Sequence, residues 1–251
     1  MIRGLYTSAM GMIVQQKRQE NVSNNLGNIE TNGFKKQELI AKAFDQVAVK
    51  NRANVSNQLS SIGDIHLGVM VDDLYTDFEQ GILEETSNPL DFAIQGEGFF
   101  TIELPNGELA YTRDGSFKIN ENGQLTTKQG YLVLDNNLQS IPLENEEIQV
   151  DGNGTITLPN GQTTILKIVN FPDGQALHRL GENMYTMEGR QVVGANGYSI
   201  KQGFMEKSNV NPLEELVKMI EITRSFESNQ KVVQSIDETL GKAVNEVGRL
   251  G

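Results

Sequence analysis

Carboxylates are the side chains of this sequence that could carry acid–base chemistry, because cysteine is absent and histidine occurs only at His66 and His178. They gather at Asp72-Asp73, at Glu84-Glu85 and within residues 144–147. A glycosidase-like pair needs two carboxyl groups about 5–10 Å apart in a cleft, and no spacing along the chain indicates one. We therefore expect solvated acids on an acidic surface, with no catalytic residue, no cofactor, no bound metal and no small-molecule substrate.

Two loops have spacings that invite a binding function, and neither fits it. Gly96-Glu97-Gly98 lacks the third glycine of a dinucleotide fingerprint, because position 101 is Thr101. The loop Asp151-Gly152-Asn153-Gly154 begins like a calcium site, but Gln162 stands where an EF-hand needs a bidentate glutamate. We interpret this loop as a hairpin turn.

The composition excludes further classes of function. The 251 residues carry a formal net charge of −12, which would repel nucleic acid and anionic membranes. No apolar run exceeds the four residues 131–134, far below the ~20 that span a bilayer. The mildly apolar stretch after Arg3 leads to no persuasive cleavage site, so we expect no cleaved signal peptide.

The sequence predicts a helix at each end of the chain, and these helices would position any site there. Near the start, apolar residues recur at three- and four-residue steps: Ile2, Leu5, Ala9, Met12, Val22, Leu26 and Ile29. Near the end, a 3.5-residue repeat continues for more than four heptads: Met219, Ile222, Phe226, Asn229, Val233, Ile236, Leu240, Ala243, Val247 and Leu250. This seam predicts a coiled-coil helix that needs a partner. Pro212 followed by Glu214 and Glu215 predicts its start.

The middle of the chain is typical of antiparallel β-structure. Short β-favouring stretches such as 99–102, 116–119 and 131–134 alternate with turn dipeptides. These dipeptides are Asn106-Gly107, Asp114-Gly115, Asn122-Gly123, Asn153-Gly154, Asn160-Gly161, Asp173-Gly174 and Asn196-Gly197. Residues 34–205 hold 23 acidic and 12 basic residues, so nearly all of the net charge lies here.

The expected fold is α+β, with long N- and C-terminal helices that pair as a coiled coil and flank a mainly antiparallel β domain. We expect a helical segment at 1–33, a connecting segment at 34–85, a β domain at 86–205 and a coiled-coil helix at 206–251. Within the connection, residues 34–49 could extend the first helix or begin a strand, 51–61 is expected to be loose, and 65–75 extended.

An asparagine-rich stretch, 21–33, allows two readings. Five asparagines beside Gly27 and Gly33 predict a helix that frays into an Asx-type turn. Alternatively, buried amides could hydrogen-bond between chains and fix one register. The residues alone favour neither reading.

Several segments resemble the bacterial flagellar rod and hook protein family. Near the start they are Ser8-Ala9-Met10-Gly11-Met12, Asn24-Asn25-Leu26 and Thr31-Asn32-Gly33-Phe34-Lys35. In the middle they are Gln80-Gly81, Asn88-Pro89-Leu90-Asp91, Gly98-Phe99-Phe100 and Tyr111-Thr112-Arg113-Asp114-Gly115. Near the end they are Glu206, Ser208-Asn209-Val210-Asn211, Glu215 and Arg224-Ser225-Phe226-Glu227. Within the family, length and motifs look most like the distal rod members, although residues 50–64 diverge.

The resemblance implies a structural protein that is not an enzyme. Its partners would be copies of itself, other axial proteins and the flagellar export apparatus, and it would polymerise through its terminal helices into the basal-body rod. The residues expected at the assembly interface are Leu5, Ala9, Met12, Val22, Asn24, Asn25, Leu26, Met219, Ile222, Phe226, Asn229, Val233, Ile236, Leu240 and Val247. A proximal rod or hook protein, an acidic-cleft hydrolase and an extracellular coiled-coil adhesin are the alternatives.

Overall fold

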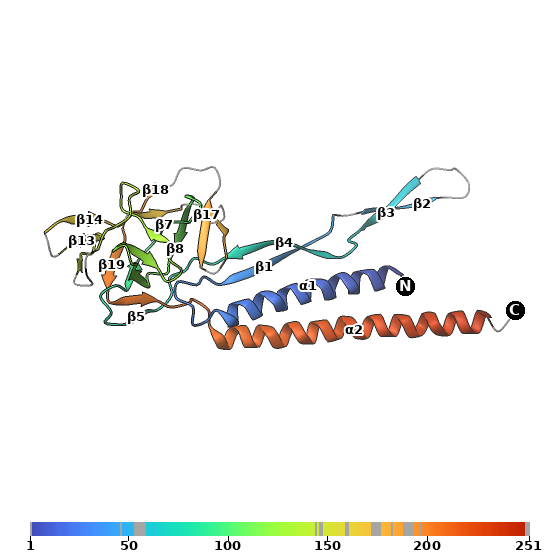
Figure 1. Ribbon diagram of the computed structural model, residues 1–251. Helices are drawn as coiled ribbons and strands as arrows, with labels where there is room; N and C mark the ends of the chain where they lie inside the picture. Colours follow the sequence, from blue (N-terminus) through green and yellow to red (C-terminus); the bar gives the residue numbers. More distant parts are fainter. Residues whose placement is uncertain are drawn as a thin grey trace. The chain divides into compact units, whose positions relative to one another are not determined.

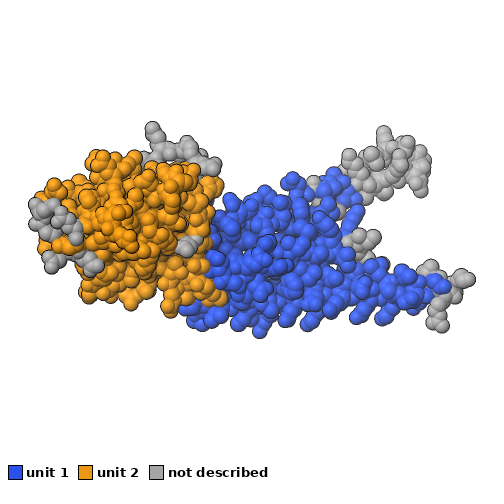
Figure 2. Space-filling view, in the orientation of Figure 1, with its two compact units in different colours: residues 1–25, 37–75, 212–251 blue, residues 26–36, 76–211 orange. Residues whose placement is uncertain are grey.

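The computed structural model describes residues 2–45, 47–52, 59–143, 145, 148–158, 161–171, 177–181, 183–187, 193–195 and 197–248. The chain divides into two compact units, coloured separately in Figure 2. The helical unit contains residues 1–25, 37–75 and 212–251, and the β unit contains residues 26–36 and 76–211. Both chain ends therefore contribute to one unit, and most of the middle forms the other.

Two helices from the opposite ends of the chain run side by side in the helical unit (Figure 1). They are α1, Ile2–Gly27, and α2, Pro212–Gly248. The helices are antiparallel, because Gly4 of α1 lies against Ile236 of α2 and Gly11 lies against Asn229. The paired terminal helices and the start of α2 at Pro212 confirm the sequence prediction.

The connecting segment forms β-ribbons. The strand β1, Gln37–Ala43, pairs with β4, Val69–Thr76, and β2, Val47–Arg52, pairs antiparallel with β3, Leu59–Ile65. Residues 37–49 thus belong mainly to strands rather than to an extended first helix. The segment expected to be loose is strand at residues 51–52 and 59–61, while 53–58 lie outside the described residues.

The β unit is built from short antiparallel strands, as expected. Those in its first half are β5 Leu83–Glu85, β6 Phe92–Gln95, β7 Phe99–Glu103, β8 Leu109–Thr112, β9 Phe117–Ile119, β10 Leu125–Thr127 and β11 Leu132–Val133. Those in its second half are β12 Gln149–Val150, β13 Thr155–Thr157, β14 Thr163–Ile165, β15 Ile168–Asn170, β16 Leu177–Arg179, β17 Met184–Met187, β18 Val193–Gly194, β19 Ser199–Gln202 and β20 Phe204–Glu206. The largest described sheet has the order β16-β17-β8-β7-β11-β10-β9, and β15 pairs with β7 and β18. Smaller sheets are β12-β13-β14, β19-β6 and β20-β5.

Alternation along β7 separates two apolar clusters, because successive side chains of a strand point to opposite faces. Phe100 and Ile102 join the larger cluster, which also contains Phe92 and Leu125. Phe99 joins a smaller aromatic cluster with Tyr111, Val169, Phe171 and Tyr185. Burial raises the pKa of Tyr185 to about 12, so its phenol stays neutral at physiological pH.

The loop at Asp151 is a hairpin turn, as the sequence predicts. Its carboxylate accepts the N–H groups of Asn153 and Thr155 at 2.9 and 2.8 Å. The hydrogen bond from Thr155 N–H is the main reason that the pKa of Asp151 is lowered. The loop joins β12 to β13, which pair antiparallel.

Candidate assembly site

The seam of α2 follows the predicted heptad. Between Met219 and Gly248, the described side chains that are not exposed occupy seam positions: Met219, Ile222, Phe226, Asn229, Val233, Ile236 and Leu240. The next seam residue, Ala243, is exposed, and the side chain of Val247 lies outside the described residues. Because Gly4 of α1 lies level with Ile236, α2 continues beyond the start of α1, which explains why its last turns are exposed. Figure 1 shows this overhang.

Over residues 4–11, the face that α1 turns toward α2 is made of small residues. A Cβ on Gly4 would lie 3.3 Å from Ile236 Cδ1, and one on Gly11 would lie 3.0 Å from Asn229 Nδ2. Ser8 is buried and lies between the two glycines by helical spacing. Small side chains let the two helices approach closely here. Sequence periodicity missed this face, because the apolar signal of α1 comes from other residues; the small-residue spacing 4, 8, 11 could have revealed it.

The predicted interface residues of α1 therefore fall in two groups. Leu5 is 36% exposed, and Ala9 and Met12 are half-buried. The α2 residues Ile236 and Asn229 instead meet Gly4 and Gly11. Val22 and Asn25 are buried within the chain, Leu26 is half-buried and Asn24 is exposed. Whether these residues touch another chain remains a prediction.

Asn25 joins three elements of the helical unit. Its Nδ2 group donates to the Gln37 carbonyl at 2.9 Å and to Glu215 Oε2 at 3.0 Å, and its Oδ1 accepts the Gln37 N–H at 3.1 Å. Asn25 and Glu215 are each 1% exposed. Because both ends of the amide are used, this contact fixes α1, the start of β1 and the first turn of α2 in one register.

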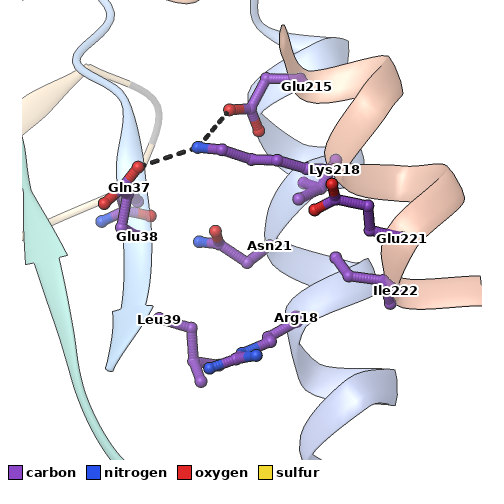
Figure 3. A pocket seen from close by; sticks show the side chains of 10 residues that line it. Arg18, Asn21, Gln37, Glu38, Leu39, Glu215, Lys218, Glu221 and Ile222 are labelled. Carbon is purple, nitrogen blue, oxygen red and sulfur yellow. Dashed lines mark hydrogen bonds and ion pairs between the residues drawn. The ribbon is translucent and has the colours of Figure 1, made fainter. Parts of the chain in front are cut away.

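Lys218 adds a charged contact to Glu215, which also accepts the Asn25 amide. Its Nζ lies 2.9 Å from Glu38 Oε1 and 3.1 Å from Glu215 Oε1 (Figure 3). Burial tends to lower the pKa of Lys218, but the hydrogen bonds to Glu38 and Glu215 outweigh it, and the pKa is raised. These groups border a cavity of about 230 Å³ between α1, β1 and α2. It is lined by Arg18, Asn21, Val22, Gln37, Glu38, Leu39, Glu215, Lys218, Glu221 and Ile222.

We expect Asn25→Asp to destabilise the helical unit by about 2 kcal/mol, because it removes a buried donor and places a second carboxylate beside Glu215. Asn24→Asp makes the same change of charge at the neighbouring exposed position and should cost little. Urea unfolding followed by the helical circular dichroism signal measures both variants. Equal stability of the two would contradict the role given to Asn25.

A second buried polar cluster lies in the β unit. Lys35 Nζ is 2.6 Å from Glu206 Oε1, Arg113 Nη1 is 3.2 Å from Glu206 Oε2, and all three side chains are almost fully buried. Glu206 Oε1 also accepts the Gly81 N–H at 2.9 Å, and Lys35 donates to the Glu79 carbonyl at 2.7 Å. Burial lowers the pKa of both Lys35 and Arg113, and the charge of Glu206 opposes this effect. The single carboxylate of Glu206 therefore offsets part of the positive charge of the two buried cations.

This cluster joins segments that are far apart in sequence. The Gly33 N–H donates to the Glu206 carbonyl at 2.7 Å, and Gly33 has a φ of 66°. Close by, Lys36 N–H donates to Asn209 Oδ1 at 2.7 Å, and Asn209 Nδ2 donates to the Asp77 carbonyl at 2.9 Å. Residues 36, 77 and 209 each lie within two residues of a point where the chain leaves the β unit. Three of these departure points are thus hydrogen-bonded together inside the β unit.

In the described part of the chain, no helix is both long and apolar enough to cross a membrane. The same residues contain no group of three or more histidine, aspartate or glutamate side chains placed to hold a metal ion. Interlocking hydrogen bonds and buried ion pairs hold the two sites described above. The fold defines a class of architecture: proteins whose two chain ends pair as helices while the middle forms a separate β unit.

Comparison with known proteins gives the family. The family model "Flagella basal body rod protein" matches residues 5–35, "Flagellar hook protein FlgE/F/G D1 domain" matches 93–158, and "Flagellar basal body rod FlgEFG protein C-terminal" matches 201–246. The flagellar basal-body rod protein FlgG of Borreliella burgdorferi is 38% identical over 98% of both chains. FlgG of Buchnera aphidicola from Acyrthosiphon pisum is 36% identical over 96% of this chain and 98% of its own. The flagellar hook-basal body complex protein FlhO of Bacillus subtilis is 34% identical over the full length of both. The chain belongs to the flagellar basal-body rod protein family.

Proposed function

We propose that the chain is a structural subunit of the flagellar basal-body rod, which polymerises through its terminal helices into the shaft that carries torque toward the hook. The observation that carries this proposal is the end-to-end similarity to proteins named as flagellar basal-body rod proteins, which includes both terminal helices. The helix pair supports it, because a half-buried seam gains stability when further chains cover it.

The distal part of the rod is the position we propose for the subunit. Relatives named FlgG match nearly the whole chain, as does FlhO, whose name places it in the hook-basal body complex. Another axial position in that complex is therefore the second candidate. Immunogold labelling of isolated basal bodies decides between them: label near the hook supports the distal position, and label near the membrane-proximal end contradicts it.

We propose that the chain leaves the cytoplasm through the flagellar export apparatus. The absence of cysteine supports this route, since no disulfide would have to be broken before an unfolded chain passes a narrow channel. The partners on this route and in the rod would be other flagellar axial proteins and further copies of the chain.

The adjacent residues Val232 and Val233 provide a test of assembly through the α2 seam. Val233 is a half-buried seam residue, whereas Val232 is exposed. We expect Val233→Asp to reduce incorporation into basal bodies at least tenfold, because an unpaired charge would be buried in the seam, while Val232→Asp incorporates normally. Immunoblots of purified basal bodies and swimming assays measure both. Absence of the unaltered chain from basal bodies contradicts the proposed function itself, and normal incorporation of Val233→Asp contradicts the role of the seam.

A further inference from the structure

The last segment of the β unit, residues 199–211, runs across strands that come much earlier in the chain, and we call it the closing strap. Its strand β19 pairs with β6, and its strand β20 pairs with β5. At the bend between β19 and β20, the Gly203 N–H donates to the Asp91 carbonyl at 2.8 Å, and the Gly203 carbonyl accepts the Thr86 N–H at 2.7 Å. The next residue after the strap is Pro212, where α2 begins. The covalent connection from the β unit to α2 therefore runs through the closing strap.

The closing strap buries few apolar side chains. Among its described residues, Ile200 is the only member of the main apolar cluster, Val210 is buried outside that cluster, and Phe204 is half-buried. Ordering a segment of this length costs more conformational free energy than two buried aliphatic side chains supply. Hydrogen bonds add to this, for example from the Val150 N–H to Gln202 Oε1 at 3.1 Å. The strap is therefore held mainly by polar contacts.

The charged contact of the strap both holds it and opposes its docking. Glu206 is buried with Lys35 and Arg113, and detaching Glu206 would let water reach both cations. Burial lowers the pKa of Lys35 and of Arg113, so the closed state disfavours their charged forms. In addition, Arg113 Nε is buried without a hydrogen-bond partner in the part of the chain that the structure describes. Because one carboxylate must offset the desolvation of two cations, docking of the strap is less favourable than its hydrogen bonds alone would make it.

The core of the β unit is built almost entirely without the strap. Strand β7 pairs with β8, β11 and β15, and its residues Phe100 and Ile102 lie in the main apolar cluster. Strand β6 is held from below the strap, because Phe92 and Ile94 are buried in the same cluster. The Phe92 N–H also donates to the Gly115 carbonyl at 3.0 Å. These contacts can persist when the strap leaves.

We propose that the closing strap opens and closes as one unit while the core of the β unit stays folded, and that it thereby acts as a releasable anchor for α2. In the closed state the chain leaves the β unit at residue 211, and in the open state it leaves before residue 199. An extended chain spans at most about 3.3–3.6 Å per residue, so opening lengthens the link to α2 by up to about 40 Å. The proposal concerns the single chain and stands independently of the proposed function.

The cysteine-free sequence allows a thiol-labelling test in the full-length chain. Ile200→Cys reports on the strap and Ile102→Cys on the core, since both isoleucines belong to the main apolar cluster and are 4% and 0% exposed. For each variant, the opening constant from labelling without denaturant is compared with the global unfolding constant from urea titration. The two constants should agree for Ile102→Cys, whereas for Ile200→Cys the opening constant should be at least tenfold larger. A smaller ratio for Ile200→Cys would overturn the proposal.

A second substitution in each cysteine variant separates opening of the strap from global unfolding. Val133→Ala in the core strand β11 should speed labelling of Ile102→Cys at least tenfold. It should change labelling of Ile200→Cys less than threefold, because the core is intact in both the closed and the open state of the strap. Acceleration of Ile200→Cys by threefold or more would show that the strap opens only when the core unfolds, and the proposal would fall.

Amide hydrogen exchange of the unaltered chain makes the same comparison without any substitution in the core. The Gly203 N–H lies in the strap, and the Thr101 N–H, bonded to the Lys167 carbonyl at 3.2 Å, lies in the core strand β7. Relative to its intrinsic rate, the Gly203 amide should exchange at least tenfold faster than the Thr101 amide. If the two amides differ in protection by less than tenfold, the strap and the core form one cooperative unit and α2 has no releasable anchor.

Discussion

Glu206→Gln is expected to lower the free energy of unfolding of the β unit by about 3–5 kcal/mol, because it removes the carboxylate that faces two buried cations. Glutamine keeps the size of the side chain, so the loss reports charge rather than a cavity. Lys35 at 2.6 Å and Arg113 at 3.2 Å, both almost fully buried, would lose their ionic partner. The Gly81 N–H would also lose its charged acceptor.

A surface ion pair one residue away supplies the matched control. Glu84 lies 3.2 Å from Lys207, and both side chains are substantially exposed. Glu84→Gln should cost less than about 1 kcal/mol, since exposed ion pairs contribute little. Urea unfolding followed by near-ultraviolet circular dichroism of the tyrosines measures both variants. A difference between them of under about 1 kcal/mol would show that the buried cluster does not stabilise the β unit.

A double variant separates electrostatics from packing in the same cluster. Lys35→Met combined with Glu206→Gln leaves one buried cation instead of two. The double variant should therefore be more stable than the sum of the two single losses indicates, by about 1–3 kcal/mol. Strict additivity would mean that Lys35 and Glu206 contribute independently.

The α2 seam was predictable because its signal is local. A 3.5-residue apolar repeat requires neighbours on one helix face, and the residues from Met219 to Leu240 show this repeat whatever the rest of the chain does. Over residues 4–11, the α1 face toward α2 was not predictable in the same way, because glycine and serine carry no apolar signal. Apolar periodicity instead indicated Leu5, Ala9 and Met12, which lie on other sides of α1.

The first reading of the asparagine-rich stretch, a helix that frays into a turn, describes the structure, and the second, hydrogen bonding between chains, stays a prediction. The helix ends at Gly27, six residues before the expected boundary, and Asn28 and Thr31 then form a turn with hydrogen bonds between their backbones and side chains. Asn25, by contrast, is a buried amide that fixes a register, although it does so within one chain. Sequence could not assign these roles, because whether an asparagine is buried depends on the distant Glu215.

The buried cluster of the β unit lies beyond any local pattern. Lys35 and Glu206 are 171 positions apart, and neither lies in a periodic segment that predicts burial. The family resemblance included both residues and Arg113 without giving them a role. Polar contacts between residues so far apart in sequence can be identified only from the three-dimensional arrangement of the strands around them.

Asp114-Gly115 shows how a correct turn signal can have an unexpected cause. Gly107, Gly123, Gly154, Gly161 and Gly197 have the positive φ that turn glycines favour, and Gly115 does not. A Cβ on Gly115 would instead lie 1.7 Å from the Phe92 carbonyl oxygen and 2.8 Å from its carbon. The Phe92 N–H donates to the Gly115 carbonyl at 3.0 Å, so the two backbones are held together at this point. Glycine is needed here because of the close approach.

We therefore expect Gly115→Ala to destabilise the β unit by about 4 kcal/mol or more, because the added methyl group meets backbone atoms that no side-chain rotation can move. Phe92 belongs to the main apolar cluster, so a shift of its backbone would disturb the packing around it. Gly107→Ala is the control: Gly107 has a φ of 82° but no atom within 4 Å of an added Cβ. It should cost about 1 kcal/mol, the strain of a left-handed alanine alone.

Gly33→Ala combines both effects and extends the test. Gly33 has a φ of 66°, and its Cβ would lie 2.5 Å from the backbone carbon of Arg113, beside the buried cluster. We expect a loss at least as large as that of Gly115→Ala, so the order of stability should be Gly107→Ala first, then Gly115→Ala, then Gly33→Ala. Urea midpoints and the yield of folded protein measure this order. If Gly107→Ala were as damaging as the other two, close approach of the backbone would not be what makes Gly115 and Gly33 necessary.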